Sequence, residues 1–179
     1  QDVNHFQATE FQGLIWVIGS YKDNRFPREA PSDLVLVYDP GNNVWIQGPS
    51  IPSNRRRGSA GLAVYQGKFY VLGGTTSGHE GGVVNWFDEF DPHTGAWRTL
   101  PDAPHNRDHF HSAVIGDKLY VVGGRRSSRS SNFNGAPVKE VDVYDFRSGR
   151  WLNSGLPDDL PIPRSGAAVA VFDGKVLIL

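Results

Sequence analysis

The stretch Gly-Lys-Phe-Tyr-Val-Leu-Gly-Gly at residues 67–74 decides the fold, because it recurs along the chain. Residues 117–124 read Asp-Lys-Leu-Tyr-Val-Val-Gly-Gly, and residues 13–20 read Gly-Leu-Ile-Trp-Val-Ile-Gly-Ser in the same frame. Gly73 lies 54 residues after Gly19 and 50 residues before Gly123. Self-similarity at a period near 50 residues is typical of a repeat architecture.

Three further markers recur in phase with this stretch. An aromatic–aspartate pair follows each copy, with the aspartates at Asp39, Asp91 and Asp145. A tryptophan stands six residues after each aspartate, at Trp45, Trp97 and Trp151. Arginines open the later units, at Arg57, Arg107 and Arg164. Markers that keep phase in this way indicate one structural unit used several times, and we interpret the three tryptophans as core between units.

Each unit is predicted to hold four short strands. In the middle unit these are 60–65, 68–72, 87–90 and a strand around Trp97. The dipeptide Gln66-Gly67 suits the positive φ angles of a two-residue hairpin turn. The glycine pair that ends the second strand marks a place where no Cβ is tolerated. Since no stretch shows a helical period, the sequence predicts an all-β fold.

This pattern resembles the kelch repeat, through the Gly73-Gly74 and Gly123-Gly124 pairs, the aromatic–aspartate third strand and the spaced tryptophans. The resemblance implies a β-propeller whose blades are four-stranded antiparallel sheets around a central channel. We expect blades at about 1–56, 57–106 and 107–163, with a partial blade at 164–179, all in one domain over 1–179. Natural propellers have ~4–8 blades. The chain is therefore expected to be an incomplete propeller, a segment of one with six or seven blades by family habit.

Composition excludes several classes of protein. The 179 residues carry 18 basic and 19 acidic side chains, a net charge of -1, which gives no basic surplus for nucleic acid. The absence of cysteine excludes disulfides and thiolate metal sites. No apolar run is long enough for membrane insertion, and residues 1–4 show no signal peptide. The compartment stays open, with an exported or cell-surface location slightly favoured.

Topology predicts which face of the propeller carries function. In a four-stranded antiparallel blade, the connections between strands two and three and between blades share one face. These are the long segments here, namely 20–33, 75–83, 125–138, 48–57, 99–107 and 155–164. Long connections vary without disturbing the sheet, and binding residues concentrate on them.

Arginines are concentrated on this face. Ten of the 13 arginines fall on these segments, and their planar forks suit carboxylates, phosphates or sulfates. An anionic or acidic-peptide ligand is therefore predicted at Arg57, Arg107, Arg164, Arg125, Arg126 and Arg129. The alternative is that the first three pair with neighbouring blades and that the loop arginines are merely solvated.

His79, His109 and His111 are candidate metal ligands. His109 and His111 share one face of a strand, and His79 approaches from the loop of the adjacent blade. However, no third ligand stands at a characteristic spacing, and His5 matches His109 in register, which favours a structural role. We therefore predict no metal and no cofactor, and retain His79 and His109 as ligand-binding candidates.

Two more residues depart from the repeat. Trp86 opens a third strand beside loop 75–83, where it suits stacking on a sugar or anchoring a peptide; the alternative is packing against the loop. Glu89 stands where sister blades have valine. Such a carboxylate is either an acid or base with a raised pKa, or one that pairs with an arginine or faces water.

Two classes of function are compatible with these sequence features. The first is a binding scaffold that presents its arginine- and aromatic-bearing loops to a protein or glycan partner, acidic partners included. The alternative is part of a carbohydrate-acting enzyme on a kelch propeller, galactose-oxidase-like or sugar-acid epimerase-like. The tyrosine–cysteine cross-link of the former cannot form in a chain without cysteine. Because no nucleophile–base pair is visible and no catalytic residue can be assigned, we favour binding.

Overall fold

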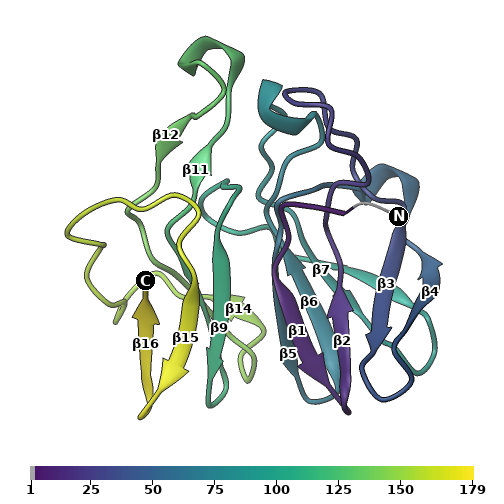
Figure 1. Cartoon of the computed structure of the whole chain (residues 1–179). Coiled ribbons are helices and arrows are strands. Elements are labelled where there is room, and N and C mark those ends of the chain that lie inside the picture. Colours follow the sequence, from purple (N-terminus) through teal and green to yellow (C-terminus); the bar gives the residue numbers. More distant parts are fainter. Residues whose placement is uncertain (1–2) are drawn as a thin grey trace.

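The computed structural model describes residues 3–179, so the first two residues of the expected blade 1–56 lie outside the described residues. Three four-stranded antiparallel sheets and a hairpin follow one another along the chain (Figure 1). The first sheet holds β1 (Ala8–Phe11), β2 (Leu14–Val17), β3 (Leu34–Asp39) and β4 (Val44–Ser50). The second holds β5 (Gly61–Tyr65), β6 (Lys68–Leu72), β7 (Phe87–Phe90) and β8 (Trp97–Leu100). The third holds β9 (His111–Ile115), β10 (Lys118–Val122), β13 (Asp142–Asp145) and β14 (Arg150–Trp151).

The remaining elements are short. The closing hairpin consists of β15 (Val169–Phe172) and β16 (Lys175–Ile178), and β11 (Arg125–Arg126) pairs with β12 (Ala136–Pro137) inside a long loop. Helical structure in residues 3–179 is limited to the 3₁₀ turns η1 (Ser53–Arg55), η2 (Gly78–Glu80) and η3 (Arg129–Ser131). The predicted all-β fold of four-stranded antiparallel sheets is confirmed.

Strand order within each sheet follows the chain, so the connections fall on two faces as topology requires. The tight turns, such as Gln66-Gly67 with φ of 48° and 76°, lie at the lower ends of the strands in Figure 1. The long connections, including η2 and the β11–β12 ribbon, rise together at the upper end. This upper side is called the long-loop face below.

Apolar side chains fill the spaces between neighbouring sheets. Ile18 and Val35 of the first blade pack with Leu62 and Phe69 of the second. Tyr70 and Phe87 pack in turn with Phe110, Leu119 and Tyr144 of the third. Because large aromatic side chains contribute most to such burial, these two seams hold the sheets side by side.

Two of the three repeat tryptophans join these seams. The ring of Trp97 lies 4.8 Å from that of Phe90, and the ring of Trp151 lies 5.2 Å from that of Phe87. Trp45 is 57% exposed, so its predicted role in the core is wrong in this structure. The physical reason is that none of the sheets in residues 3–179 covers the outer side of the first blade.

Candidate functional site

Four equivalent positions of the repeat form a hydrogen-bonded belt at the long-loop end of the first strands. Ser59 N donates to His5 O at 3.0 Å, His109 N to Ser59 O at 3.2 Å, and Gly166 N to His109 O at 2.8 Å. All four residues have positive φ, between 50° and 69°. The belt therefore holds these four positions next to one another, although they come from four successive blades.

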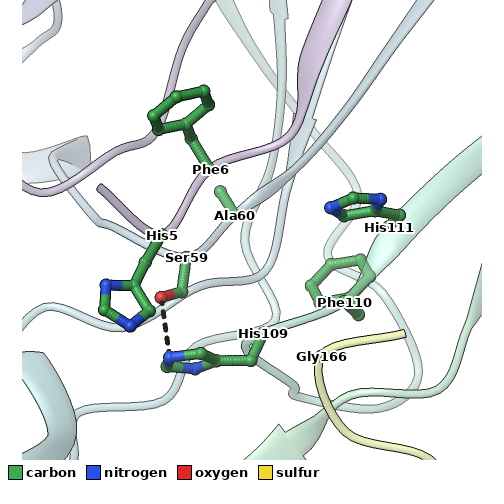
Figure 2. A pocket seen from close by; sticks show the side chains of 8 residues that line it. All are labelled: His5, Phe6, Ser59, Ala60, His109, Phe110, His111 and Gly166. Atoms are coloured by element: carbon green, nitrogen blue, oxygen red, sulfur yellow. Dashed lines mark hydrogen bonds between the residues drawn. The ribbon is translucent and has the colours of Figure 1, made fainter. Parts of the chain in front are cut away.

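A hollow of about 160 Å³ lies against this belt (Figure 2). Its lining comes from the same repeat positions and their neighbours, namely His5, Phe6, Ser59, Ala60, His109, Phe110, His111 and Gly166. Figure 2 shows His5, Ser59 and His109 gathered at one end, with Ser59 Oγ 3.4 Å from His109 Nε2. Most other lining atoms are apolar, so the polar chemistry of the hollow is concentrated in its imidazoles.

A third imidazole joins this pair. His79, on η2 in the loop between β6 and β7, has its ring centre 5.0 Å from that of His5 and 4.8 Å from that of His109. The rings of His5 and His109 are 4.9 Å apart. The three residues, called the histidine cluster below, each offer a nitrogen within 4.8 Å of the others. His79 is buried, His109 half-buried and His5 exposed.

Each ring of the histidine cluster has an oxygen partner at Nδ1. Asn4 Oδ1 lies 2.6 Å from His5 Nδ1, and Glu29 Oε2 lies 3.0 Å from His79 Nδ1. Asp108 Oδ1 bonds His109 Nδ1. An acceptor at Nδ1 holds the proton there and leaves the Nε2 lone pair available.

The surroundings of two of these rings favour the neutral form. Although His5 remains exposed as a whole residue, loss of water around its ring, together with the neighbouring His109 and His79, lowers the pKa of His5 to about 4. Burial also lowers the pKa of His109, even though Asp108 opposes the shift. Burial alone would raise the pKa of Glu29, but the hydrogen bond from His79 outweighs it and the pKa is lowered. The rings of His5 and His109 are therefore more readily neutral, and the Glu29 carboxylate more readily charged, than the free side chains.

Above the histidine cluster, the tips of three long loops meet. Phe26 of loop 20–33 and Phe133 of loop 125–138 have ring centres 5.7 Å apart. Glu80 accepts from Arg28 Nε at 3.1 Å and from Arg129 Nη2. Phe26 is 61% exposed, and the side chains of Arg28 and Arg129 are 74% and 63% exposed. These five residues are called the loop platform below.

Some of the predicted site residues lie on the long-loop face, and others are buried inside a blade. His79, His109, Arg125 and Arg129 come together on the long-loop face, where Arg125 Nη2 lies 3.0 Å from His109 Nε2. Arg126 bonds Asn106 Oδ1 at 3.0 Å, beside the cluster rather than in it. Arg164 is exposed, and its backbone carbonyl accepts from Gly124 N at 2.7 Å.

Arg57 and Arg107 belong to the interior. Both are 1% exposed. Arg57 donates to Gly73 O, Val71 O and Asp88; Arg107 donates to Gly123 O, Glu140 O and Asp142. All these acceptors lie in the arginine's own blade, so the pairing with neighbouring blades considered above is not seen. We assign both a structural role and leave them out of the binding proposal.

Trp86 and Glu89 are also engaged within the protein. Arg55 lies over the half-buried Trp86 ring, with its Cζ 4.5 Å from the ring centre, a cation–π contact. Glu89 is buried and accepts from Lys68 Nζ at 2.8 Å and Arg98 Nη2 at 2.6 Å. Its pKa is lowered and not raised, because these hydrogen bonds outweigh burial. The raised-pKa interpretation of Glu89 is therefore wrong, and its pairing with an arginine is what the structure shows.

Sequence reasoning missed four residues of this face, namely His5, Phe26, Glu29 and Phe133. The register of His5 with His109 is visible in the sequence, but a repeated position by itself indicates a structural role and not a shared site. Phe26, Glu29 and Phe133 lie in loops without a repeat pattern, so only their packing reveals them.

The chain matches known proteins over nearly its whole length. Residues 5–179 match the family described as the KLHDC2/KLHL20/DRC7 Kelch-repeats domain. Kelch-like protein terF of Aspergillus terreus is 30% identical over 178 residues, 97% of this chain and 37% of that protein. Kelch-like protein 35 of Mus musculus is 30% identical over 168 residues, 94% of this chain and 25% of that protein. The solved structure of YjhT shares the fold with a TM-score of 0.73 at 16% identity, covering 98% of this chain and 58% of that one.

The fold and its loop-bearing face define a β-propeller segment built of kelch repeats. The chain belongs to the kelch-repeat family. Kelch-repeat proteins are generally scaffolds that bind protein partners. The chain spans roughly a quarter to a little over a third of the two curated relatives named above. Among residues 3–179, no helix has the length and apolar character needed to cross a membrane.

Proposed function

We propose that this chain is a protein-interaction module that binds an acidic partner segment on the loop platform. The observation that carries the proposal is the meeting of three loops from three blades around an exposed aromatic ring flanked by arginines. Phe26 supplies the apolar anchor, and Arg28 and Arg129 supply forks for carboxylates. Aromatic and arginine side chains are the residues most enriched in binding hot spots.

The charge of the platform supports an acidic partner. Arg28 and Arg129 share the single carboxylate of Glu80, which leaves one net positive charge among the three. Arg25, exposed next to Phe26 in the chain, adds another. Surface ion pairs of this kind contribute little to stability, roughly 0–1 kcal/mol. The arginines can therefore exchange Glu80 for partner carboxylates at small cost.

A protein partner is favoured over a glycan by the composition of the platform. It joins an apolar ring to cations and has few neutral hydrogen-bonding groups. The enzyme alternative lacks support in the described residues, because the carboxylates nearest the hollow, Glu29 and Asp108, are buried and bonded to imidazoles. Probing a glycan array with the same protein tests directly whether the partner is a glycan.

The proposal is tested by selecting a random peptide display library on the wild-type protein. We expect selected peptides to be rich in Asp and Glu around an apolar residue, with affinity that falls as salt rises. Phe26→Ala should weaken binding by roughly tenfold or more, as expected of a hot-spot anchor. Arg147→Ala is the matched control, since Arg147 is 81% exposed and lies in the short turn between β13 and β14, away from the long connections. Peptides without acidic bias, or peptides that lose affinity in Arg147→Ala and keep it in Phe26→Ala, would overturn the proposal.

A further inference from the structure

We propose that His5, His79 and His109 form a three-histidine site for a divalent transition metal, with zinc the best match, which joins three blades at the long-loop face. His5 precedes β1, His79 lies in the β6–β7 loop and His109 precedes β9. Three imidazoles with an open fourth position are a recurrent zinc arrangement. The site goes beyond the proposed partner binding and does not depend on it.

The outer hydrogen bonds match those of metal-bound histidines. In metal sites, the ring nitrogen away from the metal almost always bonds a carboxylate or carbonyl oxygen, which fixes the tautomer and orients the ring. All three rings have such an oxygen at Nδ1, from Asn4, Glu29 and Asp108. The Nε2 atoms are then the ligands. Packing of three rings against one another would not by itself require an oxygen acceptor at every Nδ1 atom.

A buried carboxylate that contacts the histidine cluster supports the binding of a cation there. Glu29 is 2% exposed, and its Oε1 atom has no hydrogen-bond partner among the described residues. Asp108 is fully buried. Asp108 has a cationic neighbour in Arg125, whose Nε lies 3.7 Å from Asp108 Oδ1. Glu29 thus keeps an unpaired carboxylate oxygen in the interior, which a cation bound at the histidine cluster would complement, since a buried charge is stable only when it is paired.

Access and geometry are compatible with binding. Zn–N distances of about 2.0–2.1 Å place tetrahedral ligand nitrogens about 3.3 Å apart, so the rings must close from the spacing seen here. His5 is exposed and therefore free to rotate inward. The adjoining hollow leaves room for water or a ligand atom at the fourth position. The competing contact is Arg125 Nη2, which now donates to His109 Nε2.

The test is titration of the metal-free protein with ZnCl₂ by calorimetry at pH 7.5, and with Co²⁺ by visible absorption. We expect one equivalent of zinc bound and a rise in Tm on binding. His5→Ala, a change at an exposed residue, should weaken zinc affinity by more than about tenfold, and Glu29→Gln by about 10–100-fold, the usual effect of losing an outer partner. Arg125→Ala should bind zinc more tightly than the wild type, because the competing donor is gone.

His105→Ala is the matched control. His105 Nδ1 bonds Asp142 Oδ1 at 2.7 Å, the same type of outer bond, but His105 lies outside the histidine cluster. It should bind zinc as the wild type does. Circular dichroism and a melting curve without metal establish that each variant is folded. Absence of zinc binding by the wild type, wild-type affinity in His5→Ala, or an equal loss in His105→Ala would overturn the site.

Discussion

Arg57 and Asp88 form an ion pair inside the second blade, with Nη1 and Oδ2 2.6 Å apart and both side chains almost fully buried. Arg107 and Asp142 repeat the pair in the third blade at 2.7 Å. Each arginine enters from the connection between blades and also bonds a carbonyl of its glycine pair. The arginine that opens each of these two repeats is therefore an internal brace across the second and third strands.

We predict that Asp88→Asn destabilises the protein by about 3–5 kcal/mol, because it leaves the Arg57 charge buried without a counter-charge. Urea unfolding measures the change. Asp102→Asn is the control, since Asp102 is 46% exposed and lies 3.9 Å from Arg55; we expect less than about 0.5 kcal/mol there. Equal effects of the two changes would contradict the brace.

The glycine pair of the repeat is predicted to exclude any side chain. Gly74 has φ of +97°, and a Cβ there would lie 2.6 Å from Gly58 O. Gly74→Ala should therefore cost more than about 3 kcal/mol, from backbone strain plus overpacking. Gly95 also has positive φ, but no atom lies within 4 Å of its Cβ position. Gly95→Ala isolates the strain, about 1–2 kcal/mol, and a similar loss of Tm in both variants would refute the steric argument.

Gln7 is predicted to stabilise the packing of three blades. Its Oε1 accepts from Leu62 N and from Ser112 N, both at 2.9 Å, and its Nε2 donates to Ser112 O at 2.8 Å. Gln7→Met should cost about 2–4 kcal/mol, because two backbone N–H groups lose their acceptor. Gln66→Met, at an exposed turn, should change stability by less than about 0.5 kcal/mol. Denaturant midpoints distinguish the two, and an unchanged midpoint for Gln7→Met would show that water replaces the amide.

Stability is predicted to fall in acid through Glu89. Its pKa is lowered in the folded protein, because hydrogen bonds from Arg98, Lys68 and Tyr70 outweigh burial. The folded state therefore binds fewer protons than the unfolded state below the ordinary value of 4.5. The stabilisation is complete above that pH and is lost as the pH falls through the lower, folded-state pKa. Unfolding free energy measured from pH 7 to pH 3 should fall less steeply in Glu89→Gln, and parallel curves would contradict the assignment.

Much of the fold was predictable because it repeats. The stretch at 67–74 predicted β6 at its observed bounds, and the lengths of the connections identified the long-loop face. Site residues were less predictable. Arg129, His79 and His109 were identified as candidates, but so were Arg57 and Arg107, because arginines on connections look alike whether they turn inward or outward. For Trp86 the sequence left ligand stacking and packing within the protein as alternatives, and the structure shows Arg55 packed over the ring.

The sequence by itself determined the blade, because periodic glycines, turns and apolar strands act through contacts within one unit of about fifty residues. Only the tertiary structure decided the site. His5 and His109 come close because the belt of backbone hydrogen bonds brings equivalent positions of different blades together, and His79 joins them from the β6–β7 loop. Phe26 and Phe133 meet above them because loops without any shared pattern pack on that stack. Contacts between units depend on how blades are placed relative to one another, and no spacing within a single unit encodes that placement.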